Sequence, residues 1–525
     1  MRDFFISGRS ALFASQAAVT TSHPLATAAA YEMLRSGGNA VDAALVAVSV
    51  QSVVDPLMTG IGGDCFALYA PKGAAVPIAI NGAGRAPAAA NAQWYQDQNI
   101  QITPTSAHAV TVPGAVAAWA TLAGDHGTRS LTEIFSRAIR FAEDGYVVQP
   151  RVAWDWARST ERVQHDPDAA ALFLPHGRAP PAGAHLRNPK LGATLRAIGE
   201  RGPSAFYEGA VAEGIIAKLR GKGGLHTLED FADTKPEYVE PIMTNYRGYD
   251  VFECPPSGQG LAALMMLNML RHDNLAALNE VERLHLLAEI CKTAYHHRDA
   301  HFADQSVHDV PVKRLLSDPW REAARMGVDM RKAGAARLFD EAAHTDTVYL
   351  CVVDKDGNAV SFINSLFQGF GSGILDAGSG VLLHNRGLSF RTDPSHPNAI
   401  APRKRPMHTI IPGMLMKDGV TVAPFGVMGG HYQAMGHVQL LTNILDQNLD
   451  VQAALDAPRS FAHDGVLQLE PRFEGATAEA LSALGHNVVR ADAPLGSGQI
   501  IWIDRANGVL IAGSDGRKDS VALGY

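Results

Sequence analysis

The sequence predicts a layered protein that contains both helices and strands. Runs with apolar residues at helical spacing alternate with short β-prone runs along the whole chain. No fixed-period repeat and no long flexible linker interrupts this alternation, so a solenoid is not expected. With 525 residues and 46% apolar side chains, the chain can bury a large core without disulfides or a structural metal.

Two helices are expected near the N-terminus. The first covers 24–36 and stops at Gly37-Gly38, and Asn39 can cap the second, which ends before Pro56. The second helix is apolar nearly all round, so we expect it to be buried. Further helices are expected near 113–123, 130–144, 189–200, 208–220, 259–272 and 280–303, and strands near 65–70, 249–253, 347–353, 359–367, 408–416 and 498–503.

Charge and cysteine content exclude several classes of protein. A net charge of −8 argues against nucleic acid as a partner but leaves room for a small anionic substrate. The four cysteines lie far apart, which excludes a disulfide scaffold and a zinc finger and fits a reducing compartment. Asp3, Arg9 and Gln16 interrupt the N-terminal apolar run, and no segment is apolar enough to span a membrane. We therefore expect a cytoplasmic protein without a membrane partner.

The most informative segment is a predicted β-hairpin at 347–367. Two β-prone runs flank the turn at 354–358, which contains Asp-Gly, a strong hairpin signal. If the turn centres on Asp356, then Thr347 faces Ser365 at the open end of the hairpin. A two-residue turn would shift this pairing by one position.

A threonine at the start of this strand predicts an N-terminal nucleophile. The preceding stretch, 311–346, is charged and then polar, so it can be cut without disrupting a core. A threonine hydroxyl needs a base, and a free α-amine with a pKa of about 7.7–8.0 can serve. Inside an uncut chain Thr347 has only an amide nitrogen, so cleavage between Asp346 and Thr347 is expected before activity.

Several motifs occur in one order along the chain, in 39–66, 112–119, 255–260, 346–374, the KRP at 404–406 and Gly429-Gly430. Together they resemble the γ-glutamyltranspeptidase family of N-terminal-nucleophile hydrolases. The resemblance implies an α+β fold, a four-layer αββα sandwich. It also implies self-cleavage into a large subunit, 1–346, and a small subunit, 347–525, which together build one unit. Such a heterodimer needs no metal and no cofactor, and its further pairing is left open.

The resemblance also assigns catalytic roles. It matches Thr347 to the nucleophile, Ser365 to its supporting hydroxyl, and Gly429 and Gly430 to the oxyanion hole. The glycine pair follows an apolar run and precedes a helix-like segment, whose N-terminal N–H groups can point at a developing oxyanion. An ordinary strand serine stays the alternative for Ser365.

The substrate-binding positions depart from those of glutamyl enzymes. Aligned on the Ala-Pro that follows, Ala83 stands where those enzymes have an arginine for the α-carboxylate. Arg85 lies two residues later and is either structural or part of a rebuilt site. The positions that grip the α-amino group are Phe367, Arg386 and Ser389 here. Because an arginine repels an ammonium group, a glutamyl head group is not favoured.

The remaining groups favour a short acyl chain with a carboxylate. Arg386 can bind that carboxylate through a planar fork, with His408 and Thr409 beside it and Phe367 filling the space of a glutamyl chain. The pattern is similar to the oxamate amidohydrolases of the family, which implies conversion of oxamate and water to oxalate and ammonia. A structural ion pair with Asp376 is the alternative for Arg386.

Two other functions stay open. One is a γ-glutamyl hydrolase or transpeptidase for glutathione-like substrates, or a related acylase. The other is an unprocessed, inactive binding protein of the same fold. His297 and His301 share one helix face and suggest a metal site, but the expected hydrolase requires none.

Overall fold

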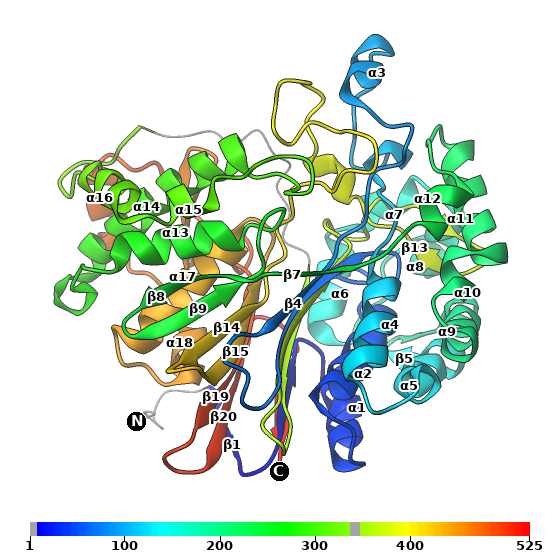
Figure 1. Cartoon of the computed structure of the whole chain (residues 1–525), viewed down its shortest axis with the longest axis horizontal. Coiled ribbons are helices and arrows are strands. Elements are labelled where there is room, and N and C mark those ends of the chain that lie inside the picture. Colours follow the sequence, from blue (N-terminus) through cyan, green and yellow to red (C-terminus); the bar gives the residue numbers. More distant parts are fainter. Residues whose placement is uncertain (1–7, 336–346) are drawn as a thin grey trace.

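The computed structural model describes residues 8–335 and 347–525, and two seven-stranded antiparallel sheets form its centre (Figure 1). In the first sheet the strand order is β1 (Leu12–Ala14), β20 (Val509–Ser514), β19 (Ser497–Asp504), β15 (Val420–Met428), β14 (Gly413–Lys417), β9 (Tyr249–Glu253), β8 (Ile242–Tyr246). In the second sheet it is β21 (Val521–Gly524), β2 (Ala18–Thr21), β10 (Val348–Val353), β11 (Ala359–Ser365), β3 (Asp64–Ala70), β4 (Ile78–Gly82), β7 (Glu237–Val239). Each sheet therefore combines strands from before and after Thr347.

Helices cover the outer face of each sheet. The second sheet packs on a helical layer that includes α1 (Pro24–Arg35), α2 (Ala40–Val54), α4 (Ala115–His126), α5 (Leu131–Asp144), α9 (Pro189–Arg201) and α11 (Gly209–Gly221). The first sheet packs on α13 (Gly260–Leu270), α14 (Glu280–His301), α17 (Tyr432–Leu445) and α18 (Val451–Asp456). Figure 1 shows the two helical groups on opposite sides of the sheets, so the layers run helix, sheet, sheet, helix.

Strand β10 shows why both sheets are apolar on both faces. Leu350 faces the helical layer of its own sheet, whereas Tyr349 and Cys351 face the other sheet. Side chains of a strand alternate between its two faces, so a strand in the middle of four layers buries every residue. The four cysteines are buried and free, as their isolated positions predict. Among the described residues, no helix is long and apolar enough to cross a membrane.

Local signals place the main elements correctly. Asn39 caps α2 and forms a capping box with Asp42, and every residue of the helix is buried, as its apolar composition predicts. The predicted mixed α+β content is confirmed. Two strands have other ends than the sequence predicts. Strand β11 stops at Ser365 instead of 367, because the φ of +79° at Phe367 takes the backbone out of the extended conformation. Strand β14 begins at Gly413 instead of 408, because His408 makes only an isolated bridge to Gly258.

Candidate active site

The hairpin of β10 and β11 brings two hydroxyl groups together. Its register pairs Val348 with Asn364, so Thr347 lies opposite Ser365, as the turn centred on Asp356 predicts. The Thr347 hydroxyl donates a hydrogen bond to Ser365 Oγ at 3.3 Å, and both residues are fully buried. Asp346, on the other side of the expected cleavage site, lies outside the described residues.

Ser365 also ends the strand. Its Oγ accepts a hydrogen bond from the backbone N–H of Phe367 at 2.8 Å. The left-handed backbone of Phe367 is strained for a residue with a bulky side chain, and this local hydrogen bond helps to hold it. The turn fixes the position of the Phe367 ring, which is buried.

The Phe367 ring supports Arg386. The guanidinium carbon lies 4.2 Å from the ring centroid, and Nη1 donates a hydrogen bond to Thr409 Oγ1 at 2.9 Å. Arg386 is fully buried in a short 3₁₀ turn, Arg386–Ser389. Asp376, the alternative partner, instead accepts hydrogen bonds from the Ser379 N–H and hydroxyl at 2.9 and 2.5 Å.

Gln433 is the functional candidate that the sequence did not indicate. It lies in the first turn of α17, is fully buried, and donates a hydrogen bond from Nε2 to Thr347 Oγ1 at 3.3 Å. Its Oε1 accepts the Ile411 N–H at 3.1 Å. Because Ile411 follows Thr409 by two residues, Gln433 joins Thr347 to the segment that holds Arg386. A glutamine inside a helix is common, so only the contact reveals this role.

Gly429 and Gly430 form the turn between β15 and α17. Their φ angles are +129° and +58°, which glycine adopts without strain. A Cβ on Gly429 would lie 2.8 Å from Gly496 Cα, so no side chain fits there. Since Gln433 from the first turn of α17 reaches Thr347, the glycine turn before that helix is close to Thr347.

A buried polar network supports the glycine turn from behind. Gln259 donates hydrogen bonds from Nε2 to the carbonyl oxygens of Thr409 and Gly430, at 2.7 and 2.9 Å. Arg298 donates from Nη1 to Gln259 Oε1 at 3.0 Å and lies 2.9 Å from His431 Nδ1. Gln259 belongs to the motif at 255–260, so this network connects that motif to the glycine turn.

A carboxylate and two imidazoles lie beneath the hairpin end. Asp64 is the cross-strand neighbour of Ser365, and its Oδ2 lies 3.3 Å from His384 Nδ1 and 3.2 Å from His408 Nε2. Burial alone would raise the pKa of Asp64, but the two rings hold it well below its ordinary value. Burial, and then the charge of Arg386, lower the pKa of His408 to about 3, so His408 is neutral.

Arg85 lies in an ion-pair network. Its guanidinium is 2.7 Å from Glu237 and 3.4 Å from Asp304, and it donates a hydrogen bond to the Arg403 carbonyl oxygen at 2.8 Å. Arg405 binds the same Glu237 at 2.8 Å. These contacts fit the structural alternative for Arg85, and a role in substrate binding stays a prediction.

The histidines of α14 form a ring stack. His297 and His301 are stacked with centroids 5.7 Å apart, and the His297 ring packs edge-on against Trp320 at 5.3 Å. Within the described residues, the only group of three or more potential metal ligands lies elsewhere, at His285, Glu289 and His486.

The site holds a buried threonine at the start of a hairpin strand, with a second hydroxyl at 3.3 Å and a glycine turn nearby. A hydroxyl in such a place can attack an amide carbonyl, so the site fits the class of amide hydrolases. Sequence comparison agrees, because the Gamma-glutamyltranspeptidase family profile matches residues 26–525. The chain belongs to this family, and the proteins it resembles are named as hydrolases, acylases and transpeptidases.

Three relatives match almost the whole chain. The glutathione hydrolase-like YwrD proenzyme of Bacillus subtilis is 33% identical, with 96% of this chain and 98% of the relative covered. The oxamate amidohydrolase proenzyme of Klebsiella pneumoniae is also 33% identical, with coverages of 96% and 97%. The crystal structure of a cephalosporin acylase from Bacillus halodurans superposes with a TM-score of 0.93 at 39% identity, covering 100% of this chain and 98% of that one.

Proposed function

We propose that this enzyme cleaves itself between Asp346 and Thr347 and then works as an N-terminal threonine amidohydrolase. The observation that carries the proposal is a closed ring of contacts around the nucleophile. Thr347 contacts Ser365, whose Oγ is bonded to Phe367, and the Phe367 ring packs on Arg386. From there the ring continues to Thr409, along the backbone to Ile411, and from Ile411 through Gln433 back to Thr347.

Processing makes the catalytic base. Thr347 Oγ attacks the carbonyl carbon of residue 346, the C–N bond breaks as an ester forms, and water releases the two chains. Thr347 then carries a free α-amine, whose ordinary pKa of about 7.7–8.0 leaves a useful neutral fraction near pH 7.5. The products, 1–346 and 347–525, stay together as a heterodimer because strands from both parts are hydrogen-bonded to one another within each sheet.

Turnover follows the same chemistry on a small amide. The α-amine takes the proton of Thr347 Oγ as the oxygen attacks the amide carbonyl, and it returns a proton to the leaving ammonia. The N–H groups of Gly429 and Gly430 stabilise the oxyanion. Water then hydrolyses the threonyl ester, which releases the acid and restores the hydroxyl.

The acyl group carries a carboxylate and no amine. Arg386 is buried and held on two sides, by the Phe367 ring and by Thr409, so its charge is fixed near the nucleophile. A fixed guanidinium favours a carboxylate and rejects an ammonium. The neutral His408 next to it adds no second charge. We therefore favour oxamate, which is converted with water to oxalate and ammonia.

An acylase that takes a longer anionic acyl chain is the second candidate. It is supported by the likeness to the Bacillus halodurans cephalosporin acylase, the structure described above. The same Arg386 would then bind a carboxylate at the far end of the chain. A γ-glutamyl substrate remains the third candidate, and an unprocessed binding protein the fourth.

A panel of amides separates these candidates. Processed protein is assayed for ammonia from oxamate, for glutamate from glutathione, and for the free amine from a glutaryl amide. Turnover of oxamate with little activity on the other two supports the proposal. Preference for the glutaryl amide selects the acylase, preference for glutathione restores the γ-glutamyl activity, and a single uncut chain without activity rejects catalysis.

A further inference from the structure

A second cluster of reactive side chains lies outside the candidate active site. His285 and Glu289 are one turn apart on α14, and His486 follows α19 (Gly475–Ala483) in the C-terminal part of the chain. His285 Nδ1 lies 2.7 Å from His486 Nε2, and that nitrogen lies 3.9 Å from Glu289 Oε1. All three residues are at least nine-tenths buried.

We infer that His285, Glu289 and His486 bind one divalent transition-metal ion of the zinc type. Two imidazole nitrogens and one carboxylate oxygen are a donor set that suits Zn²⁺ and is found in open zinc sites. The three donor atoms lie within 4.8 Å of one another, close enough to share one ion after small side-chain movements.

The hydrogen bonds around His285 prepare it as a ligand. Its Nε2 lies 2.9 Å from the carbonyl oxygen of Asp329, and a carbonyl only accepts, so the ring proton is on Nε2. This leaves Nδ1, the atom that faces His486, to offer its lone pair to an ion. Metal-binding histidines commonly donate their other N–H to a carbonyl or carboxylate in this way.

Other interactions occupy these groups when no ion is bound. The His486 Nε2–H then donates to His285 Nδ1, and Lys292 Nζ lies 2.6 Å from Glu289 Oε1. A tetrahedral zinc ion with Zn–N bonds of about 2.0–2.1 Å holds its two nitrogens roughly 3.3 Å apart. Binding therefore needs the rings to part slightly, the His486 proton to move to Nδ1, and Lys292 to leave the carboxylate.

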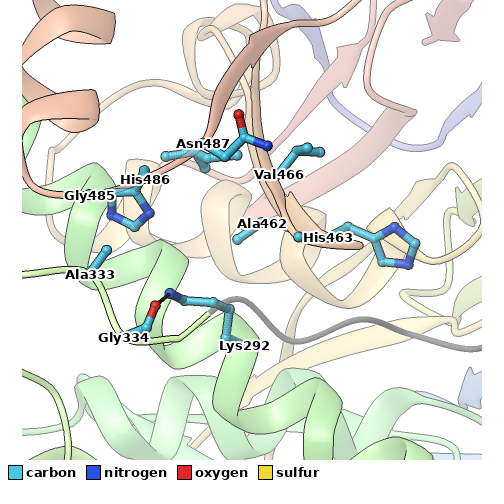
Figure 2. Close-up of a pocket in the computed structure, with 11 residues that line it drawn as sticks. Lys292, Ala333, Gly334, Ala462, His463, Val466, Gly485, His486 and Asn487 are labelled. Atoms are coloured by element: carbon cyan, nitrogen blue, oxygen red, sulfur yellow. Dashed lines mark hydrogen bonds between the residues drawn. The ribbon is translucent and has the colours of Figure 1, made fainter.

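The structure provides room for that movement. His486 and Lys292 both line a cavity of about 70 Å³, and Figure 2 shows Lys292 beside Gly334 on one side with His486 and Asn487 on another. Lys292 Nζ already donates to the Gly334 carbonyl oxygen at 2.9 Å, so the ammonium keeps a partner when it leaves Glu289. Glu289 Oε2 keeps the Gly334 N–H at 3.1 Å. The cavity is large enough for a water molecule at the fourth coordination position.

The ion would join the two parts of the chain. His285 and Glu289 precede Thr347, whereas His486 follows it. After the proposed cleavage, a shared ion would therefore connect the two subunits far from the nucleophile. This function is independent of the substrate, and metal binding itself does not depend on cleavage.

The test measures metal binding rather than activity. Full-length protein without a histidine tag is freed of metal with a chelator and titrated with Zn²⁺ against a chromophoric indicator. We expect one Zn²⁺ per 525-residue chain at micromolar concentration. His486→Ala and Glu289→Gln should each weaken binding at least tenfold. Asn487→Ala, which changes the same cavity but no ligand, should bind like the wild type. With Co²⁺, tetrahedral coordination should give visible absorption bands.

Lys292→Met gives the sharpest contrast. It keeps all three ligands and removes the competing ammonium, so zinc binding should tighten several-fold. If the ion pair between Lys292 and Glu289 has only a structural role, Lys292→Met should instead lower the melting temperature, and no variant should take up zinc. Thermal unfolding in the presence of chelator shows which variants are folded. If His486→Ala does not fold, zinc binding by Lys292→Met and Glu289→Gln tests the proposal. Absence of Zn²⁺ uptake by the wild type, or equal uptake by wild type and Glu289→Gln, would overturn the proposal.

Discussion

The side-chain amide of Gln433 donates a hydrogen bond to the hydroxyl of Thr347 across 3.3 Å. It connects residues that are 86 positions apart and places the first turn of α17 beside Thr347. In the proposed mechanism, a donor at this oxygen orients the hydroxyl and stabilises negative charge that develops on it during attack.

Gln433→Met keeps most of the side-chain volume and removes the donor. We expect kcat to fall roughly 10- to 100-fold with little change in KM, since a hydrogen bond to a charged group contributes about 1.5–3 kcal/mol. Self-cleavage should slow as well, because it uses the same oxygen. Steady-state kinetics and a time course on denaturing gels measure the two effects. Gln447→Met, the same change beyond the end of α17, is the control, and equal kinetics for both variants would remove Gln433 from the mechanism.

Thr347→Ala should leave a single chain. The wild type should give fragments of 346 and 179 residues, which by their share of the 55.9 kDa chain run near 37 and 19 kDa. Thr347→Ser keeps a hydroxyl and should still be cut. Two fragments of these sizes from the alanine variant would show that another residue starts the cleavage.

Arg386→Lys and Arg386→Ala test the carboxylate site. Lysine keeps the charge and loses the planar fork, so kcat/KM on oxamate should fall roughly tenfold. Alanine removes the charge as well, so it should lower kcat/KM about a hundredfold. Cleavage at Thr347 should continue, because it uses the protein's own backbone. Arg196→Ala, at an exposed ion pair with Glu143, is the control. Ammonia release at the wild-type rate by processed Arg386→Ala would reject the assignment.

Gly430→Ala tests the oxyanion hole. The residue has a φ of +58°, so a side chain strains the turn and disturbs its N–H groups. Loss of one oxyanion donor lowers kcat by roughly 10²–10³. Gly516→Ala, where an added Cβ meets nothing within 4 Å, should behave like the wild type. Full activity of folded, processed Gly430→Ala would exclude this role.

Buried neutral histidines predict a loss of stability in mild acid. Burial lowers the pKa of His226 to about 4, whereas its unfolded ring titrates near its ordinary value of about 6.5. Below about pH 6.5 the unfolded chain takes up the proton and the folded chain does not, so stability falls until about pH 4 and then levels off. At pH 5 the cost is about 2 kcal/mol for this residue.

Urea unfolding at pH 7 and pH 5 measures this effect. His226→Gln keeps a donor for the Val110 carbonyl oxygen, which His226 Nε2 contacts at 2.9 Å. The variant should lose about 2 kcal/mol less than the wild type between the two pH values. His185→Gln, at an exposed position, should leave the pH dependence unchanged. An equal pH dependence for wild type and His226→Gln would show that His226 is not responsible.

The sequence by itself determined the features that depend on neighbours along the chain. The Asp-Gly turn set the hairpin register, so Thr347 could be placed opposite Ser365, and apolar spacing located α2 and the helices on both sides of the sheets. The order of the motifs also identified the family. The turn and the apolar spacing are local signals, and the order of the motifs can be recognised in the sequence without knowing which residues are in contact.

Only the tertiary structure decided which distant groups meet. Gln433 reaches Thr347, and Asp64 lies between His384 and His408, through contacts between residues that are far apart in the sequence and form no periodic pattern in it. The end of β11 was misplaced because a left-handed backbone at Phe367 contradicts its residue type. Such a conformation is stable only when surrounding contacts compensate its strain, and those contacts exist only after the layers have assembled.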